Sequence, residues 1–200
     1  MALGQGKLHV VGVGGTLREH STSRWALERA LQSAAEAGAS TELLALNDLR
    51  LPMYEPGKRL AEYTASVQRF VEAVRRADAM IWSTAAYHGT LASVTKNALE
   101  FIEFLSKDAR PYLSERTVGL IATAGGDIAA VNAIGAMVHM VHSLRGNVAP
   151  LLVPIPVAQQ VFDTNGEILD PKWLGRLDQL GKLVVTSAQK WQPLAIKLGA

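Results

Sequence analysis

Short apolar runs and helical repeats of apolar residues alternate along the chain. Runs typical of buried parallel strands occupy residues 8–13, 41–46, 79–82, 116–123 and 148–153. Between them, apolar residues at intervals of three or four predict amphipathic helices over 23–37, 60–74, 91–105 and 128–141. We therefore expect a series of β-α-β units, which form a parallel sheet with helices on both faces.

The segment from 154 to 169 is less regular, and turn residues define it. Asn165-Gly166 lies between two apolar pairs and predicts a turn or a small hairpin. Asp170 and Pro171 then predict the N-cap and first position of a last helix. Its expected apolar face comprises Leu177, Leu180, Val184 and Trp191. No linker or repeat interrupts the 200 residues, so we expect one domain over residues 1–200.

Composition excludes several classes of protein. With 48% hydrophobic and 19% charged residues, the chain is neither disordered nor fibrous. The absence of cysteine excludes disulfides, thiolate catalysis and thiolate-held metals. A formal charge of +2 is too balanced to predict binding to nucleic acid or to a membrane surface. The sequence shows neither a membrane span nor a secretory signal, and we expect a cytoplasmic protein. His139 and His142 lack a nearby carboxylate, so no metal site is expected.

The loops that follow the strands carry the candidate chemistry. Ligands of open parallel sheets bind beyond the carboxyl ends of the strands. The loops to consider are therefore 14–23, 83–90 and 123–127.

The first of these loops has the residues of an anion site. Hydroxyl groups at positions 16, 21, 22 and 23 and the guanidinium of Arg18 surround the predicted N-terminus of a helix, where free N–H groups favour phosphate. Simple helix capping by the serines is the alternative. Leu17 stands where the dinucleotide fingerprint requires its third glycine, and no P-loop motif occurs. The pattern therefore favours the monophosphate of FMN in a flavodoxin-like sheet.

Two motifs resemble those of the NAD(P)H-dependent FMN reductase family. Gly15-Thr16-Leu17-Arg18-x-x-Ser21-x-Ser23 is similar to that family's phosphate loop, G-S-x-R-x-x-S-x-N. Residues 85–90 and 96–100 resemble its segment P-E-Y-[NH]-G-[ST]…K-N-x-[LI]-[DE], with Ala85-Ala86 in place of Pro-Glu. Residues 123–126 stand where the family has a third loop beside the flavin ring. The likeness extends over nearly the whole chain.

This resemblance implies a fold and a set of binding residues. The fold is an α/β flavodoxin-like three-layer sandwich with a five-stranded parallel sheet in the order 2-1-3-4-5. The implied FMN-binding residues are Thr16, Arg18, Ser21, Thr22, Ser23, Ala85, Ala86, Tyr87, His88, Gly89, Thr90, Thr123, Gly125 and Gly126. Met53 and Tyr54 either cover the docking site of nicotinamide or acceptor or belong to an ordinary surface loop held by two prolines.

The resemblance also implies an activity. NADH or NADPH passes a hydride to flavin N5, and the electrons go on to a small-molecule acceptor, with no catalytic acid or base from the protein. A quinone, azo or chromate reductase of the same fold is an alternative. A flavodoxin-type electron carrier without NAD(P)H activity is another, which the +2 charge and Arg18 disfavour. A homodimer or homotetramer is implied.

Overall fold

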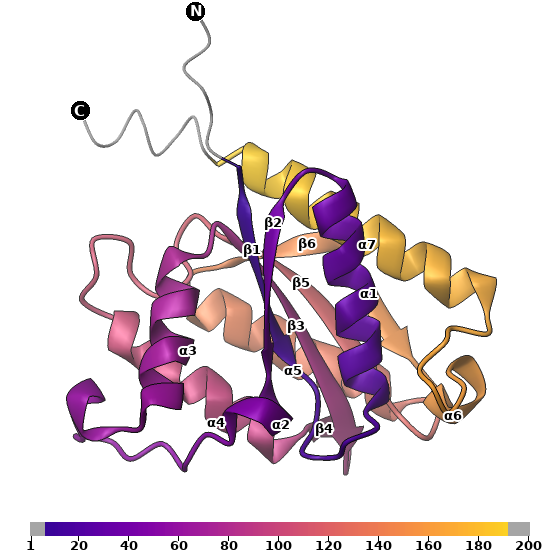
Figure 1. Ribbon diagram of the computed structural model, residues 1–200, viewed down its shortest axis with the longest axis horizontal. Coiled ribbons are helices and arrows are strands. Elements are labelled where there is room, and N and C mark those ends of the chain that lie inside the picture. The colour runs from indigo at the N-terminus through magenta and orange to yellow at the C-terminus, as the bar shows by residue number, and fades with distance from the viewer. Residues whose placement is uncertain (1–6, 192–200) are drawn as a thin grey trace, which may run out of the picture.

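The computed structural model describes residues 7–191 and has a parallel sheet at its centre (Figure 1). Its strands follow the order β2-β1-β3-β5-β6, which confirms the expected arrangement of five parallel strands. These are β1 (His9–Gly14), β2 (Ser40–Ala45), β3 (Ala79–Tyr87), β5 (Thr117–Thr123) and β6 (Asn147–Ile155). A short sixth strand, β4 (Thr90–Leu91), pairs antiparallel with the end of β3.

Helices cover both faces of the sheet and complete three layers (Figure 1). One face is covered by α1 (Thr22–Glu36) and α7 (Pro171–Gln189). The other is covered by α3 (Ala65–Arg76), α4 (Ser93–Glu100) and α5 (Ala129–Ser143). Shorter turns are α2 (Leu46–Leu49), η1 (Leu60–Glu62), η2 (Phe101–Leu105) and α6 (Ala158–Val161). Among the described residues, no helix is long and apolar enough to cross a membrane.

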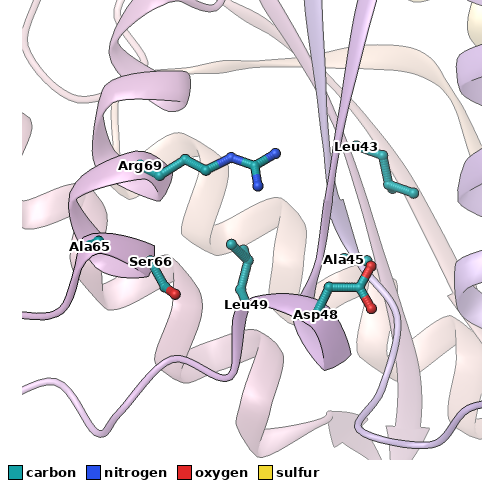
Figure 2. Close-up of a pocket in the computed structure, with 7 residues that line it drawn as sticks. All are labelled: Leu43, Ala45, Asp48, Leu49, Ala65, Ser66 and Arg69. Carbon is teal, nitrogen blue, oxygen red and sulfur yellow. The ribbon is translucent and has the colours of Figure 1, made fainter.

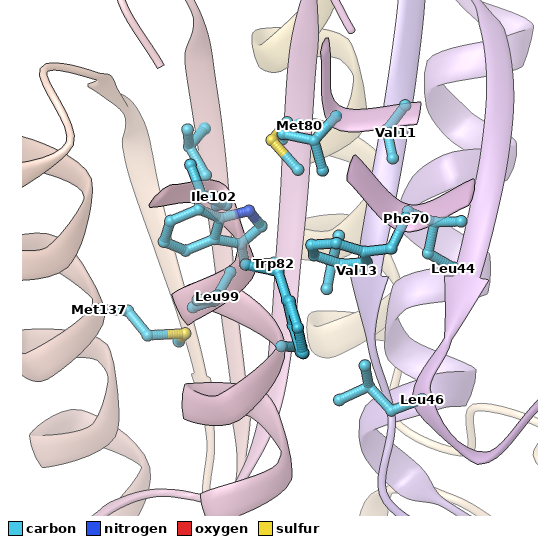
Figure 3. Packing of buried hydrophobic residues seen from close by; sticks show 14 of the residues in the cluster. Val11, Val13, Leu44, Leu46, Phe70, Met80, Trp82, Leu99, Ile102 and Met137 are labelled. Carbon is cyan, nitrogen blue, oxygen red and sulfur yellow. The ribbon is translucent and has the colours of Figure 1, made fainter. Parts of the chain in front are cut away.

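The larger hydrophobic core lies between the sheet and the α3-α4-α5 layer. Figure 3 shows Trp82 of β3 at its centre, with Leu99 and Ile102 beside it and Met137 of α5 nearby. Trp82 has no solvent exposure. Burying a large apolar side chain of this kind contributes roughly 1.5–3 kcal/mol, so this layer holds the long central strand in place.

The third strand is longer than its sequence pattern predicts. The expected strand over 79–82 and loop over 83–90 are wrong in their boundary, because β3 continues to Tyr87 and turns back at His88-Gly89. His88 (φ 50°) and Gly89 (φ 80°) are both left-handed, as a two-residue hairpin turn requires. The buried hydroxyl of Ser83 donates to the Ser23 carbonyl at 2.7 Å, and Thr84 bonds the Thr95 hydroxyl at 3.0 Å. Polar side chains with such partners are accommodated in a buried strand.

Several helix boundaries also differ from the expectation. The predicted helix over 60–74 is divided into η1 and α3, and the one over 91–105 changes to a 3-10 turn after Glu100. Trp191 lies beyond the end of α7 and not on its apolar face. The N-cap of α7 is confirmed, since the Asp170 carboxylate accepts from Lys172 N at 2.9 Å. A bridge between Phe162 and Ile168 confirms the turn at Asn165-Gly166.

The crossing of α1 and α7 depends on the absence of a side chain at Gly181. A Cβ there would overlap the Ala30 carbonyl oxygen and lie 2.8 Å from Ala34 N, whereas a Cβ on Gly175 of the same helix would meet nothing within 4 Å. We expect Gly181→Ala to lower the free energy of unfolding by about 1–3 kcal/mol through overpacking. Gly175→Ala is the control and is expected to raise it by about 1 kcal/mol through helix propensity. Denaturant unfolding measures both, and equal effects of the two substitutions would contradict the close helix contact.

Candidate functional site

Three loops meet at the carboxyl edge of the sheet, as the sequence predicts. β1, β3 and β5 are neighbours, with Gly14 opposite Ser83 and Ala85 opposite Thr123. The segments that leave these strand ends therefore lie side by side at the carboxyl ends of the strands (Figure 1).

The first loop forms a hydroxyl-rich turn into α1. Gly15 adopts a left-handed conformation (φ 89°), and the Thr16 hydroxyl accepts from Arg18 N at 3.1 Å. Ser21 is the N-cap of α1, where its hydroxyl accepts from Arg24 N at 3.4 Å. The Ser21 and Ser23 hydroxyls lie 3.0 Å apart, and Ser23 is wholly buried. The hydroxyl of Ser23 therefore reaches Ser21 and not the surface.

Two further hydrogen bonds join this turn to the neighbouring strands. The Thr22 hydroxyl donates to the Thr123 hydroxyl at 3.0 Å and connects the first loop with the third. Ser83 donates to the carbonyl of Ser23, which fixes the first turn of α1 against β3. Sequence reasoning missed Ser83 as a supporting residue, although a hydroxyl directly after an apolar strand was a signal for it.

Arg18 is the cation available at this helix N-terminus. It is exposed, and no carboxylate among residues 7–191 lies within 4.0 Å of its guanidinium. Arg24, one turn into α1, instead pairs with Glu28 at 2.9 Å and Asp48 at 3.3 Å. The hydrogen bond that the Arg24 guanidinium donates to Glu28 is the largest cause that raises the pKa of Arg24. Arg24 is therefore engaged within the protein, and Arg18 is free to bind an anion.

The second and third loops line the same edge with small residues and backbone. Ala85 and Ala86 are half-buried on β3, while Tyr87, His88, Gly89 and Thr90 form the exposed hairpin. The hairpin is held at its base because the Thr84 hydroxyl accepts from Ala92 N at 3.1 Å. A Cβ added to Gly125 or Gly126 would meet nothing within 4 Å. The third loop therefore faces open space that a ligand can occupy.

The loop after α2 is fixed by one side chain of α4. Asn97 donates to the Pro52 carbonyl at 2.8 Å and accepts from Tyr54 N at 2.9 Å. The Tyr54 ring packs edge-on against Phe101 at 5.5 Å, and burial is the largest cause that raises its pKa above 10.0. Met53, between the two clamped positions, is 73% exposed. Sequence reasoning quoted Asn97 in a motif but did not identify it as a positioning residue.

Figure 2 shows a different hollow, which lies at the β2 edge of the sheet. It measures about 370 Å³ and is lined by Leu43, Ala45, Asp48, Leu49, Ala65, Ser66 and Arg69. Its two charged groups already have partners, because Asp48 pairs with Arg24 and Arg69 pairs with Glu42 at 3.3 Å. It contains none of the predicted flavin contacts, so we do not place the flavin in it.

The donor set of the three loops fits FMN. A phosphate monoester suits hydroxyls, an unpaired guanidinium and free helix N–H groups. A flat ring suits small side chains and open space, and the side chains at 85 and 86 are small while Gly125 and Gly126 face open space. The first loop is thus the polar part of the site, suited to a phosphate, and the second and third loops are the open part, suited to a ring.

Comparisons with known proteins agree with this chemistry. The family model for NADPH-dependent FMN reductase matches residues 8–160. An NAD(P)H-dependent FMN reductase of Pseudomonas aeruginosa is 30% identical over 169 residues, which cover 82% of this chain and 86% of the relative. A subunit of the NADH:(hydroxy)cinnamate reductase of Vibrio ruber is 25% identical, with 86% of this chain and 83% of the relative covered.

Solved structures show the same fold. RosB, with a bound 8-demethyl-8-formylriboflavin-5'-phosphate, superposes with a TM-score of 0.74 at 16% identity, covering 93% of this chain and 81% of RosB. The flavoenzyme FerB of Paracoccus denitrificans superposes with a TM-score of 0.65 at 21% identity, covering 92% of this chain and 98% of FerB. The chain therefore belongs to the family of NADPH-dependent FMN reductases and is an oxidoreductase that couples a reduced pyridine nucleotide to FMN.

Proposed function

We propose that the first loop holds the FMN phosphate through Thr16, Arg18, Ser21 and the backbone N–H of Thr22. The observation that carries this proposal is the exposed guanidinium of Arg18 beside the hydroxyl-capped N-terminus of α1. Ser23 supports this site indirectly, because its buried hydroxyl forms a hydrogen bond with the Ser21 hydroxyl and orients it. The dipole of α1 adds to the attraction for an anion.

The β3–β4 hairpin and the third loop would hold the flavin ring between them. On one side the ring would meet the small side chains of Ala85 and Ala86 and the exposed hairpin residues His88, Gly89 and Thr90. On the other side stand Thr123, Gly125 and Gly126. Tyr87 is 43% exposed and borders the ring or the ribityl chain. When bound, FMN supplies the redox chemistry, since its N5 takes the hydride of NADH or NADPH. The protein binds, orients and shields the reacting partners, and no side chain is required as acid or base.

Met53 is the residue we assign to the docking side of nicotinamide or acceptor. Its backbone neighbours are clamped by Asn97, while its flexible apolar side chain stays exposed. A thioether of this kind adapts to varied flat ligands. Tyr54 contributes from the interior, by packing on Phe101 and holding the loop.

We propose that the protein acts as a homodimer or homotetramer of one-domain subunits in the cytoplasm. Large apolar side chains are exposed in the loops and at the start of α5 near the carboxyl edge, among them Met53, Tyr87, Ile128 and Val131. Apolar groups that gather on a surface mark interaction sites. A sequence without cysteine fits a reducing compartment.

Replacing Arg18 tests the phosphate site. We expect Arg18→Ala to weaken FMN binding about 10- to 100-fold, because a charge-assisted hydrogen bond contributes about 1.5–3 kcal/mol. Quenching of FMN fluorescence on binding gives the dissociation constant. Arg76→Ala is the matched control, since Arg76 ends α3 at the opposite edge of the sheet and pairs with Glu42 and Glu72. Equal affinities of Arg18→Ala and the parent would refute the assignment.

A titration of FMN tests whether the flavin is a tightly bound group or a substrate. Oxidation of NADPH and NADH is followed by absorbance while FMN rises from below to far above the enzyme concentration. If the three loops retain the flavin, we expect the oxidation rate to saturate near one FMN per subunit. If the flavin leaves as product, the rate should keep rising until FMN is in large excess over the enzyme. If neither nucleotide is oxidised at any FMN concentration, the reductase activity is refuted, and the alternative of an electron carrier without NAD(P)H activity takes its place.

A further inference from the structure

A small hollow beside the first loop includes none of the proposed FMN contacts in its lining. It measures about 160 Å³ and is lined by Leu17, Leu46, Arg50, Leu51, Val94 and Asn97. These residues come from the first loop, α2, the loop after it and α4. None of them is among the residues we assign to FMN, so we call it the Arg50 pocket and consider its ligand independently.

The walls of the Arg50 pocket are apolar and its size suits one ring. Leu46 is buried, Leu51 and Val94 are half-buried, and Leu17 is 50% exposed. An apolar cavity of about 150 Å³ accommodates benzene. A single six-membered ring is therefore the apolar group that this space can take.

One cation, the exposed Arg50, lines the pocket and folds back onto Asn47. The Arg50 guanidinium donates from Nε to the Asn47 carbonyl at 3.1 Å and from Nη2 to Asn47 Oδ1 at 3.3 Å. Within residues 7–191, Nη1 has no hydrogen-bond acceptor and no carboxylate lies within 4.0 Å of the group. The end of the guanidinium formed by Nη1 and Nη2 thus keeps N–H donors for a planar anion. Paired donors of this kind match a carboxylate.

The pocket is held in shape by its surroundings. Arg50 closes α2 in a left-handed conformation (φ 46°), with its N–H bonded to the Leu46 carbonyl at 3.1 Å. A non-glycine residue in that conformation is strained and persists only where neighbouring contacts require it. Asn97 clamps the chain at Pro52 and Tyr54, directly after the wall residue Leu51. A preformed site loses little free energy to ordering when a ligand binds.

We propose that the Arg50 pocket binds a monocyclic aromatic carboxylate, with the ring among Leu46, Leu51 and Val94 and the carboxylate on Arg50. The occupant would lie against Leu17, between the two residues assigned to the FMN phosphate, Thr16 and Arg18. The pocket therefore gives the flavin site a neighbouring small-molecule site, and binding there does not require FMN.

Titration of benzoate into the full chain without FMN tests this proposal. Ligand-observed NMR or calorimetry should give a dissociation constant on the order of 1 mM, as expected for a ligand of this size. Arg50→Gln should weaken binding roughly tenfold or more through the lost charged hydrogen bonds, and Val94→Phe should abolish it by filling the pocket. Arg76→Gln is the matched control and should leave the affinity unchanged.

Other outcomes would overturn the proposal. If benzoate does not bind, or if Arg50→Gln binds it as well as the parent does, the pocket is not its site. If acetate binds as tightly as benzoate, the apolar walls contribute nothing and Arg50 simply binds any carboxylate at the surface. Competitive displacement of benzoate by FMN would show that the pocket belongs to the flavin site. Equal FMN affinities of Arg18→Ala and the parent, with intact benzoate binding, would count against the phosphate assignment alone.

Discussion

The first and third strands approach so closely at Gly14 that no side chain can stand between them. A Cβ on Gly14 would overlap the Ser83 carbonyl oxygen and lie 3.0 Å from the Ser83 Cβ. This contact brings the Ser83 hydroxyl to the carbonyl of Ser23, at 2.7 Å, and so sets where α1 begins. The start of α1 in turn determines where the hydroxyls at 21 and 22 stand relative to Thr123. The anion-binding end of the site therefore depends on backbone packing inside the sheet.

The hydrogen bonds within the loops decide which groups remain for a phosphate. A hydroxyl has one proton to donate. Thr22 gives its proton to Thr123, and one of Ser21 and Ser23 gives its proton to the other. Besides the free N–H groups at the start of α1, three side-chain donors then remain for an anion. They are the Thr16 hydroxyl, which only accepts from Arg18 N, one proton of the serine pair, and the Arg18 guanidinium. The exposed charge of Arg18 is thus the largest single attraction, while the hydroxyl bonds keep the turn in shape.

The structural roles of residues that act within a few positions of the sequence were predictable. The roles of residues whose partners lie far away in the sequence were not. The turn at Asn165-Gly166 and the cap at Asp170 were predictable because the conformational preferences of these residues act within a few positions, and the structure confirms both. Ser21 caps α1, which the sequence offered only as the alternative to phosphate binding. The extension of β3 was missed because Ser83 and Thr84 look like loop residues until α1 and α4 supply their partners. The same holds for Asn97, whose role appears only once α4 lies beside the loop at Pro52. The strand order followed from a family resemblance, and the sixth strand followed from neither pattern nor resemblance.

The two ends of the parallel strands have different roles: residues at the amino ends stabilise the fold, and loops at the carboxyl ends form the binding site. At the edge opposite the loops, the buried guanidinium of Arg116 donates to the carbonyls of Ala77 at 2.8 Å, Arg75 at 2.8 Å and Tyr112 at 2.6 Å. Burial is the first cause that lowers the pKa of Arg116 to about 10, so the group remains charged at neutral pH. These bonds fix the end of α3 and the segments that enter β3 and β5. Because the strands are anchored at that edge, the loops at the carboxyl edge can use small and polar residues that add little to packing. A site assembled in this way can change its ligand while the sheet that positions it stays the same.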